Sequence, residues 1–157
     1  MTEWSPQSST AAPGWEANAE RIDEHLRPVT DWLFEKVDVQ AGHVVLDVAA
    51  GPGGVGHRAA ELVGPEGRVL STDWAAAMVD TARRIGASRG LNNVEYRVMD
   101  AHTMDLGDDT VDIVLCRHGF MLMENPVGAL RETRRVLRTG GNLAFSVFAS
   151  PDLNPFT

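Results

Sequence analysis

The sequence predicts an α/β fold in which helices cover both faces of a doubly wound, mostly parallel sheet. Two observations predict it. Short, β-branched apolar runs alternate with segments of helical periodicity from residue 43 onward. Several of these runs also lead directly into aspartates or glycines. Strands that alternate with helices pair in parallel through right-handed crossovers, and 157 residues suit one such domain.

The segments before the sheet are predicted to be a flexible tail over residues 1–14 and helices over residues 15–41 that cover the functional site. The tail is rich in Ser, Thr and Pro. Pro28 is expected to divide the next region into two helices, because its ring clashes with a preceding helical turn. Trp15 and Trp32 either cover a ligand from these helices or pack between them.

Residues 42–157 are predicted to form the sheet domain. The five strands are expected at 43–48, 68–71, 94–98, 111–116 and 143–148. Helices are expected around 55–63, around 78–85 and from Pro126 to Leu137, with Gly140 and Gly141 as the stop of the last helix. Residues 100–110 are polar and predict a loop with a short helical turn.

The composition argues against several classes of protein. A net charge of −8, a single lysine at Lys36 and scattered arginines leave no basic stripe for nucleic acid. No apolar run approaches the roughly 18 residues of a membrane span. Cys116 is the one cysteine, so an internal disulfide is excluded and a cytoplasmic location is expected. The five histidines offer no tight ligand spacing together with an acid, so no metal site is expected.

Three consecutive predicted strands end in or beside an aspartate, namely Asp47, Asp73 and Asp100. In an open parallel sheet, ligands bind beyond the carboxyl ends of the strands. Aspartate is also common in turns and helix caps, which explains any one of the three residues. It explains three of them at one edge less well, so the strand ends predict a ligand site.

Gly51, Gly53 and Gly56 follow the first strand with the G-x-G-x-x-G spacing of dinucleotide-binding proteins. Alone this spacing is a weak signal, and it leaves a nicotinamide-dependent oxidoreductase as an alternative. In that fingerprint a pyrophosphate approaches a helix N-terminus. Asp47 would then face the phosphates, and like charges repel in a partly dry site. The aspartate suits a ligand that carries a cation.

The sequence VVLDVAAGPGG at residues 44–54 resembles the first motif of the class I S-adenosylmethionine-dependent methyltransferases. Among them the chain is most similar to the small-molecule group related to the quinone-biosynthesis C-methyltransferases. The likeness continues through residues 71–78, 98–101, 111–117 and 134–141. It implies a Rossmann-like methyltransferase core with S-adenosylmethionine as cofactor. The implied function is methyl transfer to a small organic acceptor by direct in-line displacement.

The resemblance also implies roles for single residues. The backbone of Ala49, Gly51 and Gly53 would surround the methionine part of the cofactor, with Asp47 near its ammonium group. Ala49 stands where many members have glycine, which narrows the loop slightly. Asp73 would bind the ribose hydroxyls.

The remaining implied site residues follow the second, third and fourth strands: Trp74, Met78, Asp100, Ala101, Arg117 and His118. Trp74 and Met78 would cover one face of the adenine. Asp100 would accept a hydrogen bond from the adenine amino group, and the Ala101 amide would donate to the ring. Arg117 and His118 would lie beside the sulfonium, with His118 as the candidate general base.

Members of this family have seven strands, the last two of which are not predicted here. Residues 143–148 would then form an apolar edge without a guarding charge, and such an edge pairs readily with other chains. The expectation is a truncated chain, one part of a split enzyme, or a homo- or hetero-oligomer joined at this edge. A cofactor-binding subunit that is inactive alone is therefore the alternative function, and the acceptor itself stays open.

Overall fold

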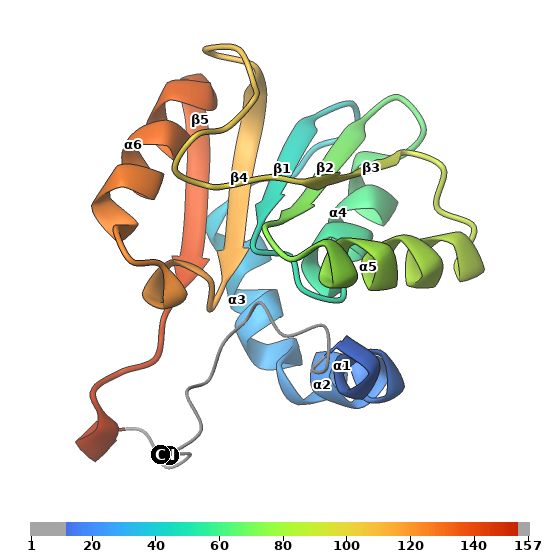
Figure 1. Ribbon diagram of the computed structural model, residues 1–157. Helices are drawn as coiled ribbons and strands as arrows, with labels where there is room; N and C mark the ends of the chain where they lie inside the picture. The colour runs from blue at the N-terminus through green and yellow to red at the C-terminus, as the bar shows by residue number, and fades with distance from the viewer. Residues whose placement is uncertain (1–11, 154–157) are drawn as a thin grey trace.

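Five parallel strands form one sheet in the order β3-β2-β1-β4-β5 (Figure 1). The structure is a computed structural model that describes residues 12–153. The strands are β1 Val44–Val48, β2 Arg68–Asp73, β3 Val94–Val98, β4 Val111–Arg117 and β5 Leu137–Ser146. The strand order changes direction between β1 and β4, which is where ligands bind in such sheets. The predicted doubly wound fold is confirmed.

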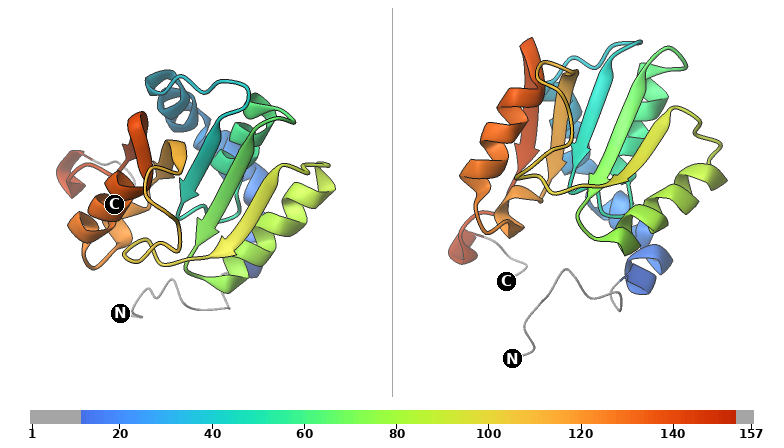
Figure 2. Two further views of the ribbon diagram at one scale, coloured as in Figure 1. Left: turned by 90° about the horizontal axis from the view of Figure 1, so that it is seen from above. Right: turned by 45° about the horizontal axis from the view of Figure 1, so that its top comes forward.

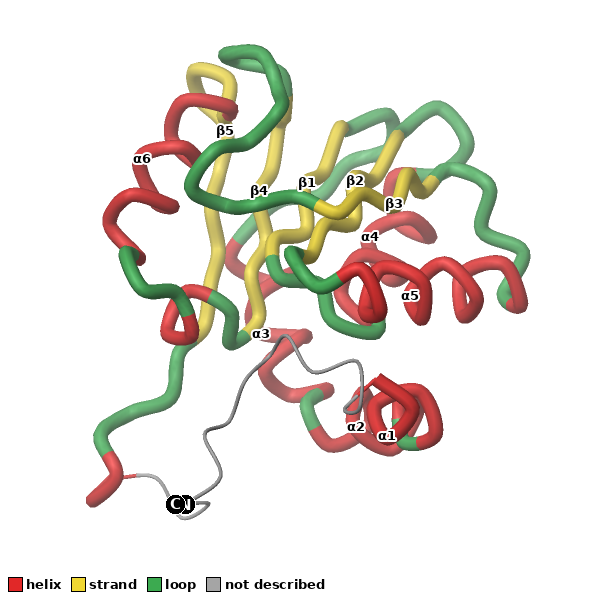
Figure 3. Tube along the Cα trace, viewed as in Figure 1, coloured by secondary structure: helices red, strands yellow, loops and turns green. Residues whose placement is uncertain are grey.

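Helices cover both faces of the sheet (Figure 2). They are α3 Arg27–Lys36, α4 Gly54–Val63, α5 Ala76–Ser88 and α6 Pro126–Val136, with single 3₁₀ turns η1 Phe120–Leu122 and η2 Pro151–Leu153. Helices α3 and α4 pack on one face, and α5 lies beside α4 at the β3 edge. Helix α6 and the long loop between β3 and β4 cover the other face (Figure 3).

The alternation of side chains along each strand builds two separate cores. Successive residues of a strand point to opposite faces, so neighbouring residues join different clusters. In β1, Val45 packs against α3 and α4, whereas Leu46 packs toward α6. In β4, Leu115 and Val114 divide in the same way. Because both faces are covered, the central strands β1 and β4 are mostly apolar and buried along their length, as the sequence predicts, whereas the edge strands β3 and β5 carry polar side chains.

Three short helices precede the sheet, where two were predicted. They are α1 Ala12–Ala17, α2 Ala19–His25 and α3. Pro28 lies in the first turn of α3 and marks the predicted division. The additional break falls at Asn18, whose side-chain amide donates to the Gly14 carbonyl (2.8 Å). Helix α1 begins at Ala12, so the predicted tail boundary at residue 14 is wrong, and residues 1–11 lie outside the described residues.

The last strand begins earlier than its sequence predicts. Helix α6 ends at Val136, and β5 runs from Leu137 to Ser146, with an irregular register opposite Val111 and Ile113. Gly140 and Gly141 therefore belong to the strand and do not stop the helix, which corrects the prediction. Gly140 has a φ of 84°, which only glycine adopts readily, and allows the irregularity. The strand also ends before residues 147 and 148.

Candidate functional site

The carboxyl end of β1 leads into a tight glycine loop beneath the sheet. Three of its residues have left-handed backbones: Ala49 (φ 55°), Gly51 (φ 54°) and Gly53 (φ 90°). A Cβ at Gly53 would lie 2.7 Å from Cε1 of His57, so glycine is required there for packing. A Cβ at Gly51 would meet no atom within 4 Å. Of the two glycines, Gly51 is therefore the one with open space where a side chain would project.

Asp47 lies in β1 and is almost completely buried, with 1% of its surface exposed. Its Oδ2 accepts a hydrogen bond from the backbone N–H of Gly56 in α4 (2.8 Å). Burial raises the pKa of this carboxyl to about 7, against the opposing charge of Arg117. The negative charge of an ionised Asp47 is thus only partly balanced by positive charge of the protein, and a cationic ligand would balance it further.

Asp73 at the end of β2 joins the glycine loop to the second strand. Its Oδ2 accepts from the Gly51 N–H (3.0 Å), and its Oδ1 accepts from the Ala75 N–H (2.9 Å). Burial raises the pKa of this carboxyl as well. Each carboxylate oxygen has a second lone pair, so Asp73 can still accept from ligand hydroxyls. Trp74 next to it is 46% exposed, and Met78 is half-buried.

Asp100 follows β3, the neighbour of β2. Its Oδ1 accepts from both the backbone N–H and the ring Nδ1 of His102 (2.8 and 2.7 Å). These hydrogen bonds lower the pKa of the Asp100 carboxyl. The Met99 N–H donates to the Asp73 carbonyl (3.0 Å), which fixes this segment against the end of β2. The structure therefore brings the loops of Asp73, Asp100 and Ala101 together at neighbouring strand ends.

Arg117 ends β4, which lies on the other side of β1 from β2, and His118 follows it directly. The Arg117 guanidinium donates to Asp23 Oδ1 (3.0 Å) and Thr30 Oγ1 (2.6 Å), so it contacts the N-terminal helices. The His118 ring stacks on Phe148 with 4.4 Å between ring centroids. Burial and the charge of Arg117 lower the pKa of His118, which keeps the imidazole neutral near pH 7. Sequence reasoning had no signal for the contacts to Asp23 and Thr30.

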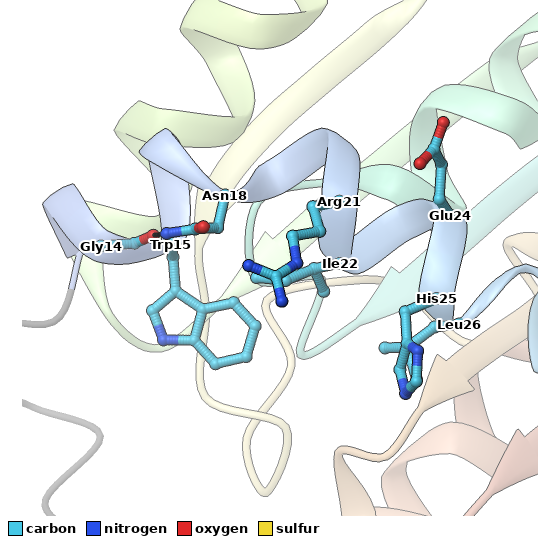
Figure 4. A pocket seen from close by; sticks show the side chains of 8 residues that line it. All are labelled: Gly14, Trp15, Asn18, Arg21, Ile22, Glu24, His25 and Leu26. Atoms are coloured by element: carbon cyan, nitrogen blue, oxygen red, sulfur yellow. Dashed lines mark hydrogen bonds between the residues drawn. The ribbon is translucent and has the colours of Figure 1, made fainter.

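The N-terminal helices α1 and α2 lie below the carboxyl edge of the sheet in Figure 1. They carry an open groove of about 850 Å³, lined by residues of both helices. Figure 4 shows Trp15, Ile22 and His25 extending from the same side of these helices. The groove is lined by apolar, aromatic and charged side chains, and none of the strand-end acids is among them.

The described part of the chain holds neither a metal-binding cluster nor a helix able to span a membrane. Among residues 12–153, no group of three His, Cys, Asp or Glu side chains has a geometry that could hold a metal ion. No helix in this range is both long and apolar enough to cross a membrane.

The charge of the strand-end acids distinguishes between two kinds of ligand. Asp47 and Asp73 are desolvated and face a loop open at Gly51, so a pyrophosphate would add like charge to the site. A ligand with an ammonium and a sulfonium would supply opposite charge. The residues present fit S-adenosylmethionine.

The comparisons with known proteins give the class of this chain. A family described as "Methyltransferase domain" matches residues 40–154, and the chain belongs to that family. The solved S-adenosylmethionine-dependent methyltransferase of Aquifex aeolicus has the same fold, with a TM-score of 0.69 and 27% identity over 83% of this chain and 71% of that one. This chain therefore has the fold and the cofactor class of the S-adenosylmethionine-dependent methyltransferases.

Two curated relatives are similar in sequence. The ubiquinone/menaquinone biosynthesis C-methyltransferase UbiE of Hahella chejuensis is 35% identical over 121 residues, which are 76% of this chain and 49% of that protein. Aklanonic acid methyltransferase DauC of a Streptomyces species is 33% identical over 123 residues, 78% of this chain and 56% of that protein. The chain thus spans about half the length of these two relatives.

Proposed function

We propose that this chain binds S-adenosylmethionine and transfers its methyl group to a small organic acceptor by in-line displacement. The observation that carries the proposal is the pair of desolvated carboxylates, Asp47 in β1 and Asp73 at the end of β2, which accept from the N–H groups of Gly56 and Gly51 beside a glycine loop that is open at Gly51. The names of the two relatives, which concern quinone biosynthesis and aklanonic acid, support a small organic acceptor.

The roles of the binding residues follow from charge and position. Asp47 would hold the ammonium group, and the backbone from Ala49 to Gly53 would surround the methionine part. Asp73 would accept from the ribose hydroxyls. S-adenosylmethionine, when bound, supplies a methyl group already activated by the sulfonium, so the protein needs no nucleophile of its own. Its task is to orient the acceptor and exclude water.

The adenine side of the site is formed by residues after β2 and β3. Trp74 offers an exposed aromatic surface, and Met78 lies one turn into α5. Asp100 retains acceptor capacity beside His102, and the Ala101 amide can donate. These groups suit an adenine amino group and a ring nitrogen, respectively.

His118 is the proposed general base for an acceptor that carries a hydroxyl or an acidic carbon. It follows β4, adjacent to β1, and its lowered pKa keeps its unprotonated form available near neutral pH. The aromatic contact with Phe148 holds the ring in one orientation. Arg117, the preceding residue, supplies positive charge next to this base.

A second candidate is a cofactor-binding subunit that requires a partner chain for activity. The observation that favours it is the edge of β5, where Phe145 and the following Val147 and Phe148 are exposed apolar side chains. We propose that this edge pairs in a homo- or hetero-oligomer. The buried thiol of Cys116, which is free, supports a reducing cytoplasmic environment.

Calorimetric titration with S-adenosylhomocysteine, with NAD as the control ligand, tests the proposal. Binding of S-adenosylhomocysteine alone is expected. Binding of NAD alone would overturn the proposal in favour of an oxidoreductase. Unchanged S-adenosylhomocysteine affinity in an Asp73→Ala, Asp100→Ala double variant would overturn the assignment of the site.

A further inference from the structure

Helices α1 and α2 are attached to the rest of the protein mainly through polar contacts. None of the described side chains of these two helices is buried, whereas α3 buries Thr30 and Leu33. Ion pairs join each N-terminal helix to a different element of the core: Glu16 with Arg84 of α5, Asp23 with Arg117 of β4, and Asp31 with Arg58 of α4. The Asp23 pair therefore joins α2 directly to the end of β4.

The Asp23–Arg117 pair differs from the other two in its surroundings. The Arg117 side chain is only 8% exposed, whereas all four partners in the other pairs are at least 39% exposed. Arg117 also donates to Thr30 Oγ1 (2.6 Å), and the Thr30 hydroxyl in turn donates to the Leu26 carbonyl (3.1 Å). The guanidinium thus joins the end of β4 to both α2 and α3. A charge pair with one desolvated partner is costly to break, unlike an exposed pair.

Gly54 provides an independent observation. It is the first residue of α4, directly after the glycine loop, and its φ is outside the left-handed region. A Cβ at this position would collide with the Asp23 carboxylate and lie 2.8 Å from its Cγ. Glycine at residue 54 therefore leaves the space that the Asp23 carboxylate occupies, and the backbone conformation does not require it.

The same guanidinium acts on the buried acid of the glycine loop. Arg117 is the main positive charge that opposes the effect of burial on Asp47, and Asp23 and Asp73 are the negative charges near it. Arg117 therefore interacts both with the carboxylate proposed to hold the cofactor and with the carboxylate that joins α2 to β4. A change in the position of α2 would alter the surroundings of both.

We propose that Arg117, Asp23 and Gly54 form a latch that holds α2 against the glycine loop and closes one side of the cofactor site. Arg117 acts in this latch as a positioning residue, and the inference rests on the proposed function. The latch accounts for a glycine at residue 54, where the backbone conformation does not itself require one.

The experiment uses Asp23→Ala, Gly54→Ala and the double variant, with Asp31→Ala as the matched control. Arg117 itself is left in place, because its removal would also leave Asp47 without its cation. Ala is a better helix former than Gly, so Gly54→Ala does not impair α4. Hydrogen exchange of residues 19–25 in the ligand-free protein measures the attachment of α2. Calorimetry with S-adenosylhomocysteine measures the site, and urea unfolding checks the fold.

The latch predicts faster exchange of residues 19–25 and a roughly tenfold loss of S-adenosylhomocysteine affinity in each single variant, within the range usual for coupled sites. The double variant should lose no more than Asp23→Ala, because both changes remove one contact. Asp31→Ala should change affinity by less than about threefold. Wild-type exchange and affinity in Gly54→Ala and Asp23→Ala would overturn the proposal. If the wild type binds no S-adenosylhomocysteine, the proposed function fails, while the exchange measurement still decides whether the latch exists.

Discussion

Replacing Asp47 with asparagine is expected to stabilise the ligand-free protein above pH 7 and to weaken its binding of S-adenosylhomocysteine. Asp47 accepts a 2.8 Å hydrogen bond from the Gly56 N–H, and the side-chain oxygen of asparagine can accept the same bond. The substitution therefore removes the charge and preserves the size and the contact. Any change in stability or affinity then reports on the charge.

The magnitude follows from the pKa of the buried carboxyl. Burial raises the pKa of Asp47 from 3.8 to about 7. Between these values the folded protein binds one proton that the unfolded chain has lost, so the unfolding free energy falls as the pH rises. The fall is about 1.4 kcal/mol per pH unit and about 4 kcal/mol over the whole interval. The Asp47→Asn variant should not show this fall of unfolding free energy with rising pH.

Urea unfolding of both proteins at several pH values between about 4 and about 8 measures the difference. The variant should gain up to about 4 kcal/mol over the wild type near pH 8 and much less near pH 4. Parallel pH profiles for the two proteins, or a less stable variant near pH 8, would refute the reasoning, because Asp47 would then be ionised without penalty. Calorimetry near pH 8 should show weaker S-adenosylhomocysteine binding by the variant, and equal affinity would remove Asp47 from the site.

Three further predictions concern the loops around the site. Gly51→Ala should lower the unfolding free energy in urea by only about 1 to 2 kcal/mol, because of its left-handed backbone, and should nevertheless lose S-adenosylhomocysteine binding. Gly53→Ala should lower the unfolding free energy by about 2 to 4 kcal/mol, because its Cβ would also collide with His57. Equal losses of unfolding free energy in the two variants would contradict this reasoning. Trp74→Ala should change stability by less than about 0.5 kcal/mol and weaken calorimetric affinity about tenfold, and unchanged affinity would place the adenine elsewhere. Arg135→Ala should lower the urea concentration at the midpoint of unfolding, because its guanidinium donates to two carbonyls of the β3–β4 loop at 2.7 and 2.9 Å; an unchanged midpoint would show that the loop holds its shape without it.

The sheet was predictable because its signals are local. Each strand of a doubly covered parallel sheet is a short apolar run, and the strand-end aspartates follow directly in sequence. The prediction failed where the backbone depends on distant partners. Strand β5 starts at Leu137 because it pairs with Val111, and Gly140 absorbs the irregular register that follows. Residues 137–141 carry no apolar alternation that would have indicated a strand.

The site was predictable as a set of strand ends and unpredictable in its contacts. Asp73 accepts from the Gly51 N–H in the glycine loop, and Asp47 accepts from the Gly56 N–H in the first turn of α4, so the two strand-end aspartates contact neighbouring parts of one segment. The partner of Arg117 is Asp23, 94 positions away, and no local pattern reports such a pair. The sequence predicts that Gly53 lies beside the cofactor. The structure shows a second reason for glycine at this position, because a side chain there would collide with His57, whose ring is hydrogen-bonded to the Ala82 carbonyl. Packing between α4 and α5 thus explains a glycine that the motif alone would assign to the ligand.

The electrostatics of the glycine loop connect the proposed function to the latch. Asp47 is buried where its charge destabilises the empty fold, and an asparagine could keep its hydrogen bond to Gly56. A residue that weakens the fold in this way is explained by a ligand that needs its charge. Arg117 offsets part of the penalty and at the same time binds Asp23 on a helix that buries none of its own side chains. In the proposed site one guanidinium therefore both holds α2 and favours the ionised form of Asp47, so we expect the helix, the arginine and a cationic ligand to stabilise one another.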